Sequence, residues 1–276
     1  MSSTHLYQIF YSEQTRRELD PDFIPLDNSS NARPDWREYW PIRNFLLNNA
    51  LIEDDFYGFF SPRFKAKTRL TAAQVKAFIL EPGPEPDVVI FSPMWDLSSL
   101  FQNVYEQAEM CHPGTGTPMA AFFRRTRPDF NFDHWVTDSR NTIFCNYFAA
   151  KPSFWRPWLK IGEELFDLAE RGEGELAEQL NAVSNYGGDV RRKVFVMERI
   201  ATFLLTTENR WKAKVNNPFR FSASPSALAK FHLEAVVSDA LKVAYTVQPF
   251  PEYRDAFAFL RRKIKEIVDA ERDAAR

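Results

Sequence analysis

Cysteine, glycine and long apolar runs are all scarce in this 276-residue chain. With only two cysteines, Cys111 and Cys145, we expect no disulfide framework, and the cytoplasm is the expected compartment. No apolar run approaches the roughly 18 residues of a membrane-spanning helix, and the N-terminus does not resemble a signal peptide. The nine glycines form no GxGxxG or Walker-type loop, which argues against nucleotide binding by either device.

A large charge of one sign is also missing, because 35 basic and 37 acidic residues leave a net charge of −2. This balance predicts no nucleic-acid-binding surface. The four histidines are scattered and form no HExxH motif, which argues against a histidine-based metal site. What the chain does have is 45% hydrophobic residues, including 26 Phe, enough to build a sizeable core.

The pattern along the chain predicts strands and helices in alternation, followed by helices alone. Strands are expected at 5–11, 56–61, 87–96 and 141–150, and helices at 33–49, 71–81, 97–112, 152–172, 190–208, 226–245 and 251–276. The run 87–96 has no polar alternation, which is typical of a strand covered on both faces. We therefore predict an α/β fold in which helices sandwich a mostly parallel sheet, with residues 1–208 as the α/β domain and 209–276 as a helical extension packed on it.

Two polar segments follow or lie between the expected strands. The stretch FYGFFSPRFKAKT runs from a strand directly into a basic cluster. Ligands of parallel sheets bind at the carboxyl ends of the strands, so Arg63 and Lys65 can hold a phosphate there. A solvated loop without a ligand explains them equally well. In the loop 24–36, Asp27 and Asn28 can contact a ligand, although turn chemistry also accounts for them.

Four carboxylate or ion-pair positions are candidates for chemistry. Asp96 ends an apolar run, where it can bind a metal, orient a sugar hydroxyl or cap the following helix. Glu106 lies toward the end of that helix. Glu198 and Arg199 interrupt an apolar helical stripe, where a charged pair must be paired or solvated. They are either a buried ion pair that fixes packing or a functional carboxylate with its partner.

Five segments occur in a fixed order between residues 5 and 205. They are HLYQIFY, FYGFFSPRF, DVVIFSPMWDLSSLFQNVYEQAEMCHPG, NTIFCNYFAAKPSFWRPWLKIGEELF and VFVMERIATFLL. This ordered series resembles a group of bacterial GT-A-type glycosyltransferases associated with capsule and O-antigen polysaccharide synthesis. The resemblance implies a GT-A-like fold, a nucleotide-sugar donor and a glycan or lipid-linked acceptor, handled in the cytoplasm or at the periphery of the inner membrane. The oligomeric state is left open.

The resemblance also implies roles for particular residues. Arg63 and Lys65 would approach the donor diphosphate, while Asp27 and Asn28 would contact the nucleoside. Asp96 would contact the donor or a metal.

An inverting transferase also needs a carboxylate base, for which Glu106 and Glu198 compete. Enzymes of this group usually hold Mn²⁺ or Mg²⁺ through a D-x-D motif, whereas the segment SPMWD supplies Asp96 alone. That departure keeps a second hypothesis open, a non-catalytic glycan-binding or scaffold module derived from the same fold.

Overall fold

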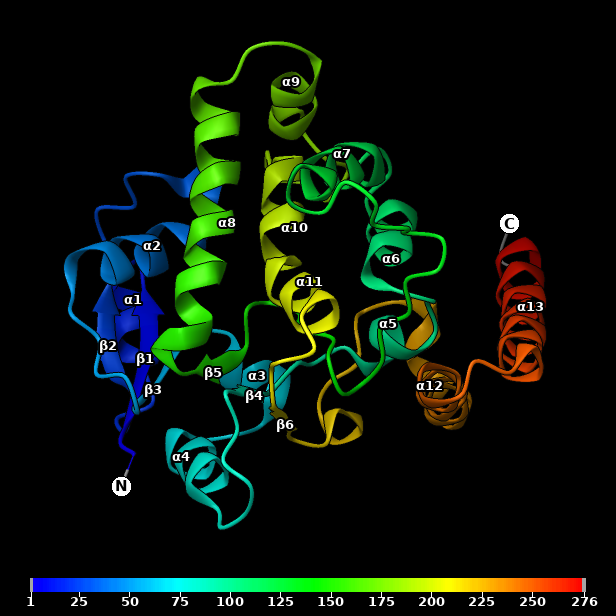
Figure 1. The fold of residues 1–276 in the computed structure, drawn as a ribbon, viewed down its shortest axis with the longest axis horizontal. Helices are drawn as coiled ribbons and strands as arrows, with labels where there is room; N and C mark the ends of the chain where they lie inside the picture. The colour runs from blue at the N-terminus through cyan, green and yellow to red at the C-terminus, as the bar shows by residue number, and fades with distance from the viewer. Residues whose placement is uncertain (1, 275–276) are drawn as a thin grey trace.

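The computed structural model describes residues 2–274 and is organised around one six-stranded sheet (Figure 1). The strand order is β2-β1-β3-β5-β4-β6. The strands are β1 (Thr4–Phe10), β2 (Ile24–Asp27), β3 (Phe56–Phe60), β4 (Val88–Ile90), β5 (Phe148–Ala150) and β6 (Ala213–Val215). All neighbours pair in parallel except for β5, which is antiparallel to both β3 and β4. The predicted α/β class with a mostly parallel sheet is therefore confirmed.

The helices include most of those that the sequence predicts. They are α1 (Glu13–Arg17), α2 (Tyr39–Asn48), α3 (Phe64–Thr68), α4 (Ala72–Leu80), α5 (Trp95–Ser99), α6 (Val104–Cys111), α7 (Gly116–Thr126), α8 (Pro152–Arg171), α9 (Glu175–Asn181), α10 (Arg192–Glu198), α11 (Ile200–Thr207), α12 (His232–Val247) and α13 (Pro251–Ala274), with short 3-10 turns η1 (Pro34–Trp36), η2 (Pro218–Arg220) and η3 (Ala227–Lys230). The helices expected at 97–112 and 190–208 are each divided in two. None of these helices is long and apolar enough to cross a membrane, within the part of the chain that the structure describes.

Two hydrophobic cores lie on the two faces of the sheet. The larger one packs the sheet against α2, α8, α10 and α11, and the smaller one packs it against α3 and α4. In β3, Phe59 belongs to the larger core and Phe60 to the smaller one, because successive strand residues point to opposite faces. Five consecutive buried residues in β3 thus reflect a strand covered on both sides.

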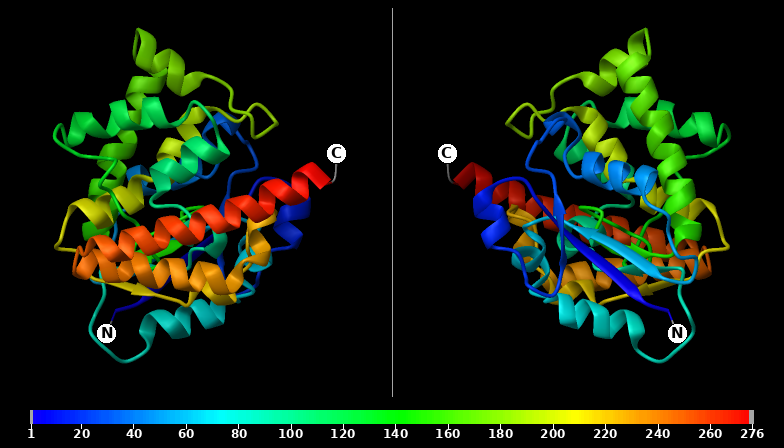
Figure 2. Two further views of the ribbon diagram at one scale, coloured as in Figure 1. Left: turned by 90° about the vertical axis from the view of Figure 1, so that its right-hand side faces the viewer. Right: turned by 90° about the vertical axis from the view of Figure 1, so that its left-hand side faces the viewer.

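The C-terminal helices α12 and α13 lie side by side along one flank of the molecule (Figure 2). α12 also packs on α5, the helix that follows β4. The segment that precedes α12 contributes β6 to the sheet, where Ala213 pairs with Val88 and Val215 with Ile90. The region expected to be helical after residue 208 therefore also completes one edge of the sheet.

Candidate functional site

The carboxyl ends of the parallel strands define one edge of the sheet. β3 and β4 end there at Phe60 and Ile90, and antiparallel β5 begins beside them at Phe148. Residues that follow β3 and β4 or precede β5 therefore meet at this edge. It is the edge at which open α/β sheets bind ligands.

Three non-glycine residues at this edge have left-handed backbone conformations. Met94 has φ 64°, Cys145 has φ 60° and Asn146 has φ 54°. Such conformations cost free energy in residues with a side chain, and they cluster at functional sites. Asn146 is only 4% exposed, and its Oδ1 has no hydrogen-bond partner among the described residues. A buried carbonyl oxygen without a donor is rare in folded proteins and calls for a partner that the protein itself does not supply.

Lys67 of α3 provides a cation at the same edge. Its Nζ donates to Sγ of Cys145 at 3.0 Å and lies 5.7 Å from the centre of the Tyr147 ring. Burial lowers the pKa of Lys67, but Cys145 and the carboxylates of Glu198 and Glu38 offset this and raise it. Burial raises the pKa of Cys145 to about 11, so the pair is an ammonium beside a neutral thiol at neutral pH.

Glu198, the last residue of α10, is the carboxylate of this cluster. Its side chain is 27% exposed, and its Oε2 lies 3.6 Å from the guanidinium of buried Arg199. Burial and the negative charge of Glu38 raise the pKa of Glu198 above its usual value, although Arg199 and Lys67 oppose the shift. An accessible carboxylate with a raised pKa is suited to accept a proton from a reacting hydroxyl.

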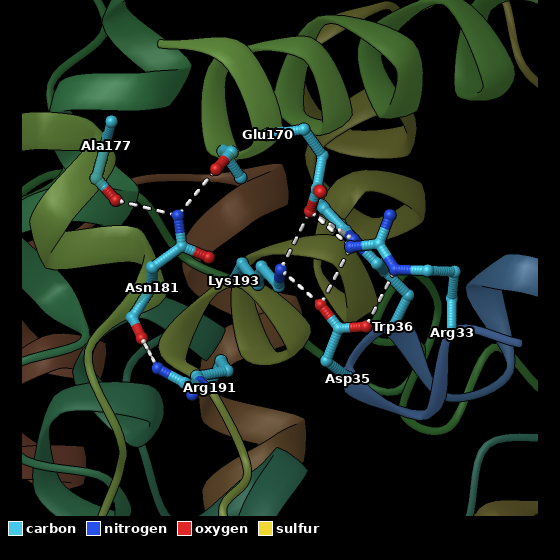
Figure 3. A network of polar contacts seen from close by, with 9 residues as sticks. Arg33, Asp35, Trp36, Glu170, Ala177, Asn181, Arg191 and Lys193 are labelled. Atoms are coloured by element: carbon cyan, nitrogen blue, oxygen red, sulfur yellow. Dashed lines mark hydrogen bonds and ion pairs between the residues drawn. The ribbon is translucent and has the colours of Figure 1, made fainter. Parts of the chain in front are cut away.

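An ion network around buried Lys193 joins η1, α8 and α10 (Figure 3). Nζ of Lys193, in α10, lies 2.7 Å from Asp35 Oδ2 in η1 and 3.0 Å from Glu170 Oε1 in α8. The Lys193 side chain is 2% exposed, so these partners are needed to compensate its burial. The network therefore ties η1, which precedes Glu38, to α10, which ends at Glu198.

The predicted phosphate ligands lie at this edge, but with unequal roles. Arg63 is the exposed N-cap of α3. Burial raises the pKa of Tyr147, and the positive charge of Arg63 opposes this rise. The hydroxyls of Tyr147 and Ser61 are 2.5 Å apart. Lys65, two residues before Lys67 in α3, is exposed, while Lys67 is the lysine that contacts the cluster.

Asp27 ends β2 beside the end of β1, and Asn28 follows it. Oδ1 of Asp27 accepts from the Ser29 N–H at 2.7 Å. Hydrogen bonding from Ser29 lowers the pKa of Asp27. The Asn28 N–H donates to the carbonyl of Phe10 at 2.8 Å. These contacts agree with the turn chemistry, and contact with a nucleoside stays a prediction.

Asp96 is fully buried and occupied by neighbouring donors. Its oxygens accept from the Ser224 N–H at 2.8 Å, from the Ser224 hydroxyl and from the Ser226 hydroxyl at 3.1 Å. The expectation that Asp96 caps the following helix is wrong, because Met94 is the N-cap of α5. Asp96 instead ties α5 to the segment before α12.

A divalent metal finds no evident ligand set in residues 2–274. No group of three or more His, Cys, Asp or Glu side chains is placed to hold one there. Because both oxygens of Asp96 already accept hydrogen bonds, its prediction as a metal ligand is not supported by its surroundings.

Glu106, the competing base candidate, belongs to a different cluster. Its Oε2 accepts from the Gln102 N–H at 2.7 Å, and its Oε1 from the Arg261 guanidinium at 2.6 Å. These bonds fix the start of α6 and hold α13 against it. Of the two candidates, only Glu198 lies within electrostatic reach of Lys67 and Glu38.

Sequence reasoning missed Glu38, Lys67, Cys145 and Asn146. A signal was available for Lys67, because Phe64, Lys67 and Thr68 share one face of a helix, and Phe64 and Thr68 are buried. From the sequence alone the segment is interpreted as a loop after a strand, which hides this helical face. The left-handed backbone at Cys145 has no sequence signal, and the one at Asn146 has only a weak one, because asparagine adopts this conformation more often than other non-glycine residues.

Comparison with protein-family models, with curated proteins and with solved structures gives no match for this chain. The functional assignment therefore depends on its own residues and their geometry.

Proposed function

We propose that this protein is a glycosyltransferase that moves a sugar from a nucleotide-sugar donor to a glycan or lipid-linked acceptor in bacterial surface polysaccharide synthesis. The observation that carries the proposal is that Glu198, half-buried and with a raised pKa, lies within electrostatic reach of the Lys67 ammonium, which contacts Cys145 at the carboxyl edge of the sheet. The mixed sheet, with its single antiparallel strand, is compatible with the GT-A-like fold implied by the ordered sequence segments.

The proposed reaction is a direct displacement at the anomeric carbon. The bond from that carbon to the leaving diphosphate oxygen breaks, and a bond to the acceptor oxygen forms. The acceptor hydroxyl gives its proton to the Glu198 carboxylate, which acts as the general base. Lys67 and Arg63 stabilise the negative charge that develops on the diphosphate.

Other groups at the edge would position the substrates. The unpartnered Oδ1 of Asn146 can accept a hydrogen bond from a sugar hydroxyl. Asp27 and Asn28, at the neighbouring strand end, stay candidates for nucleoside contact. The buried position of Asp96 makes it a positioning residue for α5, not a group that touches the donor.

The test combines binding with turnover. UDP-, GDP-, CMP- and dTDP-linked sugars are screened by thermal shift with and without Mn²⁺ or Mg²⁺, because a ligand that binds only the folded state raises Tm. Donor hydrolysis is then measured for wild type, Glu198→Gln and Glu106→Gln. We expect a shift with one nucleotide class and loss of hydrolysis in Glu198→Gln alone. Equal activity in Glu198→Gln and wild type would refute the assigned base.

A second candidate is a non-catalytic glycan-binding module with the same fold. The engagement of both Asp96 oxygens by serine donors favours it, because the position that resembles D-x-D is not free. This module would bind a polysaccharide in the absence of nucleotide and would show no thermal shift with any nucleotide sugar.

A further inference from the structure

Arg192, the first residue of α10, differs from the cations near it because it forms no ion pair within residues 2–274. Lys193 and Arg199 are both paired with carboxylates. Arg192 is half-buried, and its Nε has no hydrogen-bond partner among the described residues. A charged group that is withdrawn from water is costly unless an acceptor compensates it. This guanidinium therefore calls for an acceptor that the described chain does not supply.

The Arg192 guanidinium lies directly against Gly114, in the turn between α6 and α7. Gly114 has φ 85°, a conformation that favours glycine, and a Cβ atom at this position would collide with the guanidinium. The N–H groups of Gly114 and Gly116 donate to the Glu109 carboxylate at 3.0 and 2.7 Å. Glu109 thus fixes the turn, and the missing side chain of Gly114 makes room for the guanidinium.

Two buried polar side chains of the same turn, His112 and Thr115, also lack partners. His112 is 9% exposed and Thr115 is 0% exposed, and neither Nδ1 of His112 nor Oγ1 of Thr115 has a hydrogen-bond partner in the described part of the chain. Thr115 is the N-cap of α7, but its hydroxyl does not cap the helix, because the third helical residue is Pro118, which has no N–H. Buried polar atoms without partners are rare, and His112 and Thr115 lie on either side of Gly114 in the chain.

Phe195 holds the His112 ring beside Arg192. Phe195 follows Arg192 by three residues, so both side chains lie on one face of α10. The Phe195 ring stacks on the His112 ring, with 3.8 Å between their centres. Burial and the positive charge of Arg199 lower the pKa of His112 to about 4, so the imidazole is neutral at pH 7 and one of its nitrogens can donate a hydrogen bond. Arg192, His112 and Thr115 therefore gather around one glycine turn.

We propose that Arg192, His112 and Thr115 bind a phosphoryl group at the turn between α6 and α7. A phosphoryl group presents three strong acceptor oxygens, which suits donors from three side chains better than the two oxygens of a carboxylate do. A guanidinium binds such oxygens through two parallel N–H groups. Arg192 and Glu198 lie at opposite ends of α10, about 9 Å apart at 1.5 Å per residue. The phosphoryl site is therefore separate from the carboxyl edge of the sheet and does not depend on the proposed glycosyltransferase activity.

The loop 184–190 forms the outer wall of this site. Its base is closed by the Ser184 N–H, which donates to the Val190 carbonyl at 2.8 Å. Tyr186 of this loop is 64% exposed, and its ring packs edge-on against the His112 ring, with 5.4 Å between their centres. Displacement of this one exposed side chain would give a phosphoryl group access to His112.

Calorimetric titration with pyrophosphate at constant ionic strength tests the site. The titration is made in Lys67→Met, so that the lysine at the carboxyl edge of the sheet does not contribute. We expect pyrophosphate to bind this variant, and to bind about tenfold more weakly or less when Arg192→Gln is added, because a charge-assisted hydrogen bond is lost. Gly114→Ala should have the same effect, since its Cβ displaces the guanidinium. Gly174→Ala is the matched control, because Gly174 has φ 87° but a Cβ there meets no atom within 4 Å.

Nitrogen-15 spectra of the histidine rings locate the bound pyrophosphate directly in the wild-type chain. We expect the ring signals of His112, identified by their loss in His112→Gln, to shift on titration. Those of His5, which is hydrogen-bonded to Asp55 at 2.8 Å, should stay in place. Unshifted His112 signals, pyrophosphate binding that is unchanged by Arg192→Gln, or tighter binding of malonate than of pyrophosphate would overturn the proposal.

Vesicles that contain phosphatidic acid distinguish the two sources of a phosphoryl group. Co-flotation of wild type, but not of Arg192→Gln, would support the proposal with a lipid phosphate as the ligand. Binding of pyrophosphate without co-flotation would support it with a soluble phosphate compound as the ligand. In both cases the circular dichroism spectrum of Arg192→Gln should match that of wild type.

Discussion

The ammonium of Lys67 lies 3.0 Å from the sulfur of Cys145, which joins α3 to the left-handed turn before β5. The two residues are 78 positions apart in the chain. Because the pKa of the thiol is raised to about 11, Cys145 does not neutralise the lysine at neutral pH. The contact orients the cation without cancelling its charge, which leaves Lys67 available to an anionic ligand.

Replacement of Lys67 by Met should impair turnover much more than the same change at Lys65. Loss of a positioned group that stabilises transition-state charge typically costs about 10²–10³ in kcat. Lys65 is exposed, so we expect Lys65→Met to remain near wild type. The measurement is nucleotide-sugar turnover by both variants under identical conditions. Equal losses would mean that the basic segment acts only through its overall charge.

The raised pKa of Glu198 predicts the acid limb of the pH–rate profile. A general base must be ionised, so activity should rise with pH as Glu198 loses its proton. The midpoint should lie above the value of about 4.3 for an unperturbed glutamate. A profile of kcat/KM between pH 4 and pH 8 measures it. A midpoint at or below the unperturbed value would exclude Glu198 as the titrating base.

Glu198→Gln should stabilise the fold while it removes activity. Since the folded state raises the pKa of Glu198, it binds the proton more tightly than the unfolded state does. The ionised carboxylate therefore costs stability, and this cost appears as pH rises from the unfolded pKa through the raised folded one. We expect a gain on the order of 1 kcal/mol at neutral pH and little gain below about pH 4.

Urea unfolding of wild type and Glu198→Gln at both pH values measures this difference. Glu106→Gln is the matched control, because it breaks a half-exposed pair with Arg261 and should cost only about 0–1 kcal/mol. A Glu198→Gln variant that is less stable than wild type at neutral pH would show that the carboxylate serves packing.

The sequence predicted the fold where a pattern was long or bounded by a clear signal. The helix predicted at 71–81 is observed as α4, where the side chain of the N-cap residue Thr71 accepts from the Gln74 N–H. β2 and β6 were missed, because they are edge strands of four and three residues with mostly exposed or half-exposed side chains. Such strands owe their structure to pairing with β1 and β4, and local composition does not reveal it.

The sequence predicts only part of the candidate site, because several of its residues come together only in the folded chain. Glu198 was recognisable as a charge within an apolar helical stripe. Glu198 is preferred over Glu106 as the base because Lys67 and Glu38 lie near it in the fold, although both are distant from it in the sequence. Asp96 had a good signal at the end of an apolar run, but Ser224 and Ser226 approach it only in the folded chain.

Asp96→Asn should lower stability and leave the chemistry of the folded protein largely intact. The three groups that contact Asp96 are the N–H and hydroxyl of Ser224 and the hydroxyl of Ser226, and all three donate hydrogen bonds to it. The NH₂ group of an asparagine would face these donors in a fully buried site. An unsatisfied buried polar group costs about 1–3 kcal/mol. Thermal unfolding measures the loss, and turnover is compared well below Tm. Loss of turnover without loss of stability would instead indicate that Asp96 touches the donor.

Lys242→Met should be among the most destabilising single changes in the C-terminal helices. Nζ of Lys242 donates to three buried carbonyls, of Ser98 at 2.5 Å, Phe101 at 2.8 Å and Thr137 at 2.6 Å. The methionine would fill the space but leave all three without this donor, at a cost of about 3 kcal/mol. Lys230→Met, which removes an exposed pair with Glu271, should cost at most about 1 kcal/mol.

The pH dependence of the stability difference between wild type and Lys242→Met identifies the Lys242 ammonium as the source of that difference. Burial lowers the pKa of Lys242 to about 8, despite the opposing charge of Asp239, from 10.5 for a free lysine. Between these values the unfolded chain keeps a proton that the folded chain has released, so the group's contribution to stability rises with pH. The stability gap between wild type and Lys242→Met should therefore widen from pH 8 to pH 10, as measured by urea unfolding. A constant gap would mean that Lys242 stays fully charged in the folded protein and that its hydrogen bonds outweigh its burial.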